Sequence, residues 1–145
     1  MRAFHEQLYS RPSLRDLLPV ACLLFIVALF AWLGSRDKAN TFDELIHVTA
    51  GYTYWTQNDY RLQPENGNLP QRVAGLLPTI TGSHPRIPIG SQYWKISGQW
   101  QLADKAWFKS DKDHREILKQ SRIGMLLFNL GGFAVLFWIS ASIWG

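Results

Sequence analysis

Two long, uncharged apolar runs constrain this chain more than any other feature of its sequence. They cover residues 17–33 and residues 123–144. At about 1.5 Å per residue, the shorter run reaches roughly 26 Å as a helix, near the lower limit for crossing a membrane, and the longer run is ample. Gly, Ser and Ala in the second run are residues that let membrane helices approach closely. The fold class that we predict is an all-α membrane protein with two transmembrane helices, joined by a long external loop that carries short amphipathic helices.

Basic residues before the first run favour a cytoplasmic N-terminus; they are Arg2, Arg11 and Arg15. A secretory signal peptide is the competing interpretation, but its apolar core is usually shorter, and no small-x-small cleavage site follows here. The loop between the runs also carries Lys and Arg, although loops of this length largely escape the charge rule. We therefore expect a multi-pass protein of the cell inner membrane with both termini cytoplasmic. Residues 1–16 would be a cytoplasmic tail, and residues 34–122 a periplasmic loop.

Charge and cysteine usage exclude several classes of protein. The net charge of +4 is spread along the chain without a basic cluster, which gives no support to nucleic-acid binding. Cys22 is the single cysteine, so no disulfide can form within one chain. The sequence has no glycine-rich phosphate loop, nucleophile elbow, Cys-x-x-Cys or His-Glu-x-x-His motif. Candidate chemistry must therefore come from the polar loop.

The first helix that we predict in the loop runs from Phe42 to Gln57. Thr41 and Glu44 fit a capping box at its start. Asp43 then lies in the first turn, where the helix dipole favours a carboxylate. Helical spacing places His47 and Tyr54 on the same face as Asp43, with Ala50 or Gly51 between them.

A second short helix is predicted over residues 69–77. Asn68 is its expected cap, Pro70 suits its first turn, and Pro78 is expected to end it. Further along, Trp94, Trp100 and Trp107 are spaced roughly as on a helix. Packing against neighbouring helices is the favoured interpretation of these rings, and an interfacial or groove-lining surface is the alternative. Residues 109–122 are a charged helical approach to the second apolar run.

The acidic residues at the start of the first loop helix have structural and chemical interpretations. Glu44 and His47 have the i, i+3 spacing of di-iron bundles, but those sites need a second such motif and further carboxylates. Capping alone is a sufficient role for Glu44. Asp43 gains only tenths of a kcal/mol from the dipole, so it is the stronger functional candidate. For His47, a packing role and a site role are equally supported.

The same residues carry a resemblance to a family over residues 15–80. An apolar span is followed by Phe42-Asp43-Glu44-x-x-His47, Gly51-Tyr52-x-Tyr54, Asn58-Asp59-Tyr60-Arg61-Leu62 and Pro64-Glu65. This order resembles the N-terminal part of the GT-C glycosyltransferases, which include protein O-mannosyltransferases and aminoarabinose transferases. The resemblance implies a partial GT-C fold and transfer of a sugar, with inversion, from a polyprenyl-phosphate donor to an acceptor at the external membrane face.

The resemblance also implies roles for individual residues. Its external-loop acid, the general base, falls on Asp43, with Glu44 beside it as the second catalytic candidate. Its Pro-Glu position matches Glu65, in a region that relatives use for metal or donor phosphate. The basic residue and proline pair that normally follow are missing here, and Arg72 is the replacement cation that we expect. The candidate substrate-binding residues are therefore His47, Tyr54, Glu65 and Arg72. No cofactor is certain, and a divalent metal is compatible with the resemblance.

Two spans are fewer than a GT-C enzyme needs, so we expect this chain to be the N-terminal portion of a larger enzyme and inactive alone. The expected partners are a lipid-linked sugar donor, membrane lipids and the remaining spans of that enzyme or partner membrane proteins. The alternative is a non-catalytic two-span scaffold or partner-binding protein, or a truncated, inactive gene product. An in-frame continuation of the gene with further apolar spans would favour the enzyme.

Overall fold

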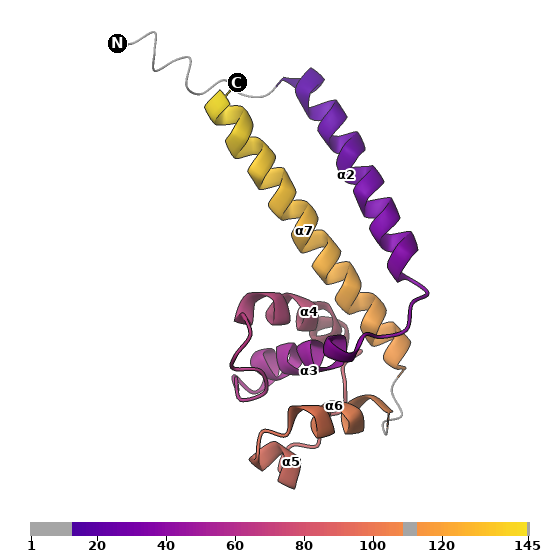
Figure 1. Cartoon of the computed structure of the whole chain (residues 1–145), viewed down its shortest axis with the longest axis vertical. Helices are drawn as coiled ribbons and strands as arrows, with labels where there is room; N and C mark the ends of the chain where they lie inside the picture. The colour runs from indigo at the N-terminus through magenta and orange to yellow at the C-terminus, as the bar shows by residue number, and fades with distance from the viewer. Residues whose placement is uncertain (1–12, 109–112, 145) are drawn as a thin grey trace, which may run out of the picture. The chain divides into compact units, whose positions relative to one another are not determined.

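The computed structural model describes residues 13–108 and 113–144, and all regular elements in these ranges are helices (Figure 1). The chain divides into two compact units. One comprises residues 1–35 and 126–145, and the other comprises residues 36–125, which we call the helical module. The all-α prediction is therefore confirmed for the described part of the chain.

Two helices are long and apolar enough to cross a membrane. Helix α2 spans Leu14–Ser35 and helix α7 spans His114–Trp144. The candidate membrane-spanning segments within these helices are Arg15–Ser35 and His114–Ile143. Large apolar side chains are exposed along both helices, as suits contact with lipid rather than water. These helices are consistent with a membrane protein.

Helix α2 begins three residues before the apolar run. The main-chain N–H and the hydroxyl of Ser13 both donate to the Asp16 carboxylate, at 2.9 and 2.6 Å. This pairing caps the first turn and extends the helix toward the N-terminus. Most of the expected cytoplasmic tail, residues 1–12, lies outside the described residues.

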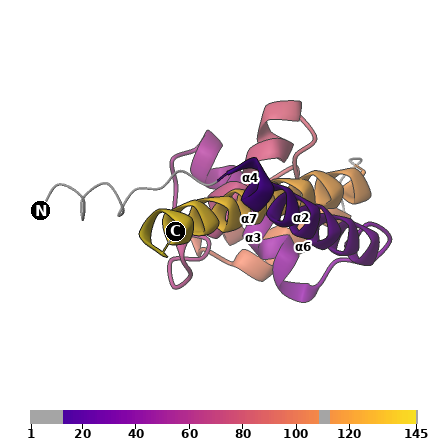
Figure 2. The same ribbon diagram turned by 90° about the horizontal axis from the view of Figure 1, so that it is seen from above.

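The helical module is built on two helices that touch through their backbones. Helix α3 spans Phe42–Thr56 and helix α4 spans Asn68–Thr81, and they lie alongside each other (Figure 1 and Figure 2). A Cβ atom added at Gly51 would lie 1.9 Å from the carbonyl oxygen of Gln71. One added at Gly75 would lie 2.4 Å from the carbonyl carbon of Gly51. Only glycine permits this close crossing, which positions the polar side chains of both helices.

The remaining helices of the module cover α3. Helix α5 spans Gln92–Lys95 and helix α6 spans Gln99–Phe108. Trp107 is 1% exposed, and its indole N–H donates to the buried Thr49 hydroxyl at 2.9 Å. Trp94 is also buried, so the packing interpretation is right for these two rings. Ile117 and Leu118, from the first turns of α7, join the same core as α3 and α6.

The predicted bounds of α3 differ from the observed ones by one residue, but those of α4 were wrong at its C-terminal end. Helix α4 continues past Pro78 to Thr81 and ends at Gly82, which has φ 76° and so adopts the left-handed conformation typical of a helix C-terminus. The Thr79 hydroxyl donates to the Gly75 carbonyl at 2.6 Å, next to the turn that Pro78 interrupts. Asn68 is the first residue of α4 rather than its cap. Of the charged approach, residues 109–112 lie outside the described residues and the rest is helical from His114 onward.

Candidate functional site

The capping box at the start of α3 is present as predicted. The Thr41 main-chain N–H donates to Glu44 Oε2 at 2.8 Å. Asp43 lies in the same first turn with an exposed side chain. Within the described ranges, no hydrogen bond or ion pair engages the Asp43 carboxylate. The two neighbouring acids therefore have different environments although they are adjacent in sequence.

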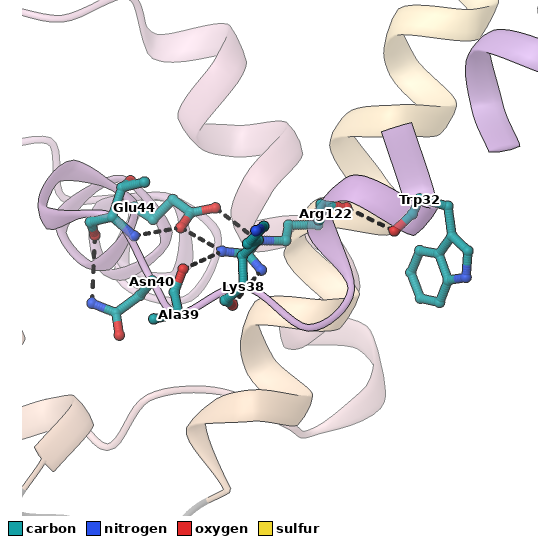
Figure 3. Close-up of polar contacts among 8 residues, drawn as sticks. Trp32, Lys38, Ala39, Asn40, Glu44 and Arg122 are labelled. Atoms are coloured by element: carbon teal, nitrogen blue, oxygen red, sulfur yellow. Dashed lines mark hydrogen bonds and ion pairs between the residues drawn. The ribbon is translucent and has the colours of Figure 1, made fainter. Parts of the chain in front are cut away.

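Glu44 has a second partner that the sequence did not indicate. Arg122 Nε donates to Glu44 Oε1 at 2.8 Å and Nη2 donates to Oε2 at 2.8 Å, which is a two-point contact (Figure 3). Arg122 also donates to the carbonyl oxygens of Lys38 at 2.9 Å and Ala39 at 3.0 Å. The side chains of the ion pair are only 14% and 29% exposed for Arg122 and Glu44. Arg122 thereby ties the chain before α3 to the first turns of α7.

The ion pair changes the acidity of Glu44. Burial raises the pKa of this carboxyl, but the hydrogen bonds from Arg122 and Thr41 outweigh burial and hold the pKa below its ordinary value. Glu44 is therefore ionised at neutral pH with its oxygens already engaged. A carboxylate in this state is a weak proton acceptor for a substrate.

Tyr54, which is buried, and His47, which is half-buried, belong to a polar network between α3 and α4. The Tyr54 hydroxyl donates to Gln71 Oε1 at 2.7 Å, and Gln71 Nε2 lies 3.3 Å from His47 Nδ1. Gln71 Nε2 also donates to Gln63 Oε1 at 3.2 Å. Gln71 is 1% exposed and is the shared member of the network. Sequence reasoning missed Gln71, and its only signal was an amide on the face of α4 that also carries Gly75.

Gln63 occupies an unusual backbone conformation in the same network. Its φ is 139°, a region that residues with side chains rarely adopt, and the residue is 5% exposed. Gln63 Nε2 donates to Gln99 Oε1 at 3.0 Å, and its Oε1 accepts from Asn66. These contacts join the turn after α3 to α6 and hold Gln63 in that conformation.

Arg72 and Glu65 lie near the C-terminal end of α3. The Arg72 guanidinium lies over the rings of Trp55 and Tyr60, 4.9 and 5.3 Å from their centroids. Its Nε donates to Asn68 Oδ1 at 2.7 Å, and its Nη2 donates to the Tyr60 hydroxyl. Glu65 is exposed in the turn before α4.

Burial, and then the charge of Glu65, raises the pKa of Tyr54, while the charge of Arg72 lowers it. Arg72 reaches this region through Tyr60, whose ring centroid lies 4.8 Å from that of Tyr54 and whose hydroxyl accepts from Arg72. The predicted site residues therefore form two groups, because Asp43 and Tyr54 are separated by roughly 16 Å along the axis of α3. His47, about 6 Å along the axis from Asp43, lies between the groups.

An aromatic groove of about 520 Å³ adjoins the start of α3. Phe42 and Trp100 stack in its wall with ring centroids 3.9 Å apart. Lys105 lies over the ring of Tyr93, 4.4 Å from its centroid, and both residues line the groove. Phe42 is 71% exposed and directly precedes Asp43. Trp100 is thus the tryptophan to which the alternative, groove-lining interpretation applies.

In the ranges 13–108 and 113–144, no three His, Cys, Asp or Glu side chains gather closely enough to hold a metal ion. Comparisons with protein-family models, with curated proteins and with solved structures find no match for this chain. The assignment of a site therefore depends on the geometry of the residues themselves.

Proposed function

We propose that this chain is the N-terminal portion of a membrane glycosyltransferase, which moves a sugar from a polyprenyl-phosphate donor to an acceptor at the external membrane face. In this proposal the protein lies in a bacterial inner membrane, the helical module is periplasmic and both ends of the chain are cytoplasmic. The proposal originates in the sequence resemblance, and one structural difference supports it.

The structural difference lies in the hydrogen-bond partners of the Asp43 and Glu44 carboxylates. Both oxygens of Glu44 accept hydrogen bonds from Arg122, and one also accepts from Thr41. Asp43 is exposed at the positive end of the same helix and directly follows Phe42, which lines the aromatic groove. A general base needs a carboxylate within reach of the acceptor and free to take its proton. Asp43 meets this requirement better than Glu44.

The proposed reaction is a displacement at the anomeric carbon of the donor sugar. Asp43 accepts the proton of the acceptor hydroxyl while the oxygen of that hydroxyl attacks the anomeric carbon. The bond between the anomeric carbon and the phosphate oxygen breaks, and the polyprenyl phosphate leaves with the electron pair, which gives inversion. His47 is the substrate-binding candidate nearest to Asp43 along α3. Tyr54, Glu65 and Arg72, at the other end of α3, would contact a more distant part of the substrates.

A scaffold that binds other membrane proteins is the second candidate, and the aromatic groove favours it. Phe42 and Phe108 are 71% and 54% exposed, and exposed aromatic rings beside a groove are typical of surfaces that bind a partner. This function needs no general base.

Sugar transfer distinguishes the two candidates. The protein as encoded in its full gene is reconstituted in proteoliposomes with a radiolabelled polyprenyl-phosphate sugar and membrane extract as a source of acceptor. The proposal predicts transfer that requires Asp43. Absence of transfer, together with loss of a co-purifying membrane protein from a Phe42→Ala/Phe108→Ala variant, would favour the scaffold.

A further inference from the structure

A second cavity in the helical module, of about 450 Å³, has a basic lining. Its walls come from the chain that follows α2 and from the first turns of α7. The lining residues that matter for its chemistry are Arg36, Asp37, Lys38, His114, Arg115 and Leu118. We call this cavity the basic pocket. It is separate from Asp43, which does not line it.

The charge of the basic pocket is positive at neutral pH. Arg36, Lys38 and Arg115 are cations, and among the described residues of the lining Asp37 is the single carboxylate. Asp37 is already paired with Arg36, whose Nε lies 2.9 Å from Asp37 Oδ2, and the Asp37 side chain is 80% exposed. Lys38 and Arg115 are therefore available to an anion. The buried side chain of Leu118 adds an apolar surface to the same pocket.

Hydrogen bonds hold one wall of the basic pocket in place. Arg122 binds the carbonyl oxygens of Lys38 and Ala39, and it is itself held by Glu44 through two hydrogen bonds (Figure 3). The backbone that carries the Lys38 side chain is thus fixed before any ligand arrives. A preformed site loses less conformational entropy on binding than a mobile one.

Chain connectivity keeps the basic pocket close to the end of helix α2, and this position indicates which anions it could meet. Arg36 directly follows Ser35, the last residue of the apolar helix α2. Three residues of extended chain reach at most about 11 Å, so Lys38 cannot lie farther than that from the end of this helix. Basic side chains at the end of a membrane span attract the phosphate groups of anionic lipids.

We propose that the basic pocket binds the phosphate group of an anionic phospholipid. Arg115 and Lys38 contact the phosphate, the guanidinium of Arg115 matching its geometry. Leu118 contacts the start of the acyl region. This proposal does not depend on the proposed sugar transfer, because the pocket uses neither Asp43 nor the aromatic groove.

The test is native mass spectrometry of the purified protein in detergent, titrated with phosphatidylglycerol or with phosphatidylcholine of the same acyl chains. We expect phosphatidylglycerol to bind about 25-fold more tightly, because both Lys38 and Arg115 attract its net negative charge, whereas the choline cation offsets that attraction in phosphatidylcholine. Each removed cation near the phosphate should cost about five-fold, so Lys38→Gln/Arg115→Gln should lose about 25-fold in affinity for phosphatidylglycerol. Binding of phosphatidylcholine should change little.

The matched control is Lys95→Gln/Lys119→Gln, which removes the same charge from exposed residues outside the pocket. Equal losses in the two double variants would overturn the site and leave only a general charge effect. If the pocket variant fails to fold, Arg115→Gln alone should still lose about five-fold while Arg115→Lys loses less; an unchanged affinity in Arg115→Gln overturns the proposal. Inorganic phosphate at millimolar concentration should not displace the lipid, and displacement would identify free phosphate as the ligand instead.

Discussion

The close crossing of α3 and α4 makes Gly51→Ala the most informative change for the fold. The added methyl carbon would lie 1.9 Å from the Gln71 carbonyl oxygen, whereas contacts below 3.0 Å are essentially never seen for Cβ atoms. The obstacle is main chain, so no rotamer change relieves it, and the helices must separate by about 1 Å. That separation would also pull Gln71 away from Tyr54.

The expected cost of Gly51→Ala is about 3 kcal/mol or more, because overpacking costs typically 1–3 kcal/mol where side chains can still adjust. For a unit of this size, each kcal/mol lowers Tm by about 4–8 °C, so we expect a decrease of roughly 12–24 °C. The assay is thermal unfolding of the detergent-solubilised protein, followed by tryptophan fluorescence, since Trp94 and Trp107 are buried in the module.

Gly34→Ala is the control, because a Cβ atom there meets nothing within 4 Å. It should leave the unfolding of the module unchanged. A Gly51→Ala protein that unfolds within about 3 °C of the wild type would refute the backbone contact and the packing derived from it.

Two further predictions concern Glu44 and the orientation of the chain. Hydrogen bonds from Arg122 and Thr41 hold the folded-state pKa of Glu44 below its ordinary value, so its ionised form stabilises the module at pH values above that ordinary value, and this contribution is lost as the pH falls through the folded-state pKa. The difference in Tm between the wild type and Glu44→Gln should therefore shrink on acidification, and a difference that stays constant from pH 7 to pH 3 would contradict the ion pair's role. For orientation, Gln92→Cys in a Cys22→Ala background should react with an impermeant thiol reagent in intact spheroplasts; labelling only after lysis would place the module in the cytoplasm.

Local signals in the sequence predicted α3 well. Thr41 and Glu44 form a capping box, whose hydrogen bonds involve residues three apart, and the pattern is readable without knowledge of the fold. The same kind of local reasoning failed at α4. Pro78 was expected to end this helix, but proline can be accommodated inside a helix when packing compensates. The helix instead ends at Gly82, which adopts the left-handed conformation.

The contacts that define the sites were beyond prediction because they join distant parts of the chain. Glu44 and Arg122 are separated by 78 residues, and only the tertiary structure brings them together. Gly51 and Gly75 carry no side chain that could indicate a partner. Gln71 has a polar side chain typical of an exposed helix position, yet it is buried because Tyr54 and Gln63 satisfy its amide. Local pattern therefore predicted the acids of α3 but not the residue that distinguishes them.

The most direct measurement of the central claim is the rate of sugar transfer by Asp43→Asn and by Glu44→Gln, side by side in proteoliposomes. An amide cannot accept the acceptor's proton, so Asp43→Asn should lower turnover by about 10²-fold or more with donor binding largely intact. Glu44→Gln keeps the capping hydrogen bond and should cost much less at a temperature where its Tm shows the module to be folded. A folded Glu44→Gln protein with the larger loss of turnover, or an Asp43→Asn protein that transfers sugar at the wild-type rate, would contradict the assignment of Asp43 as the base.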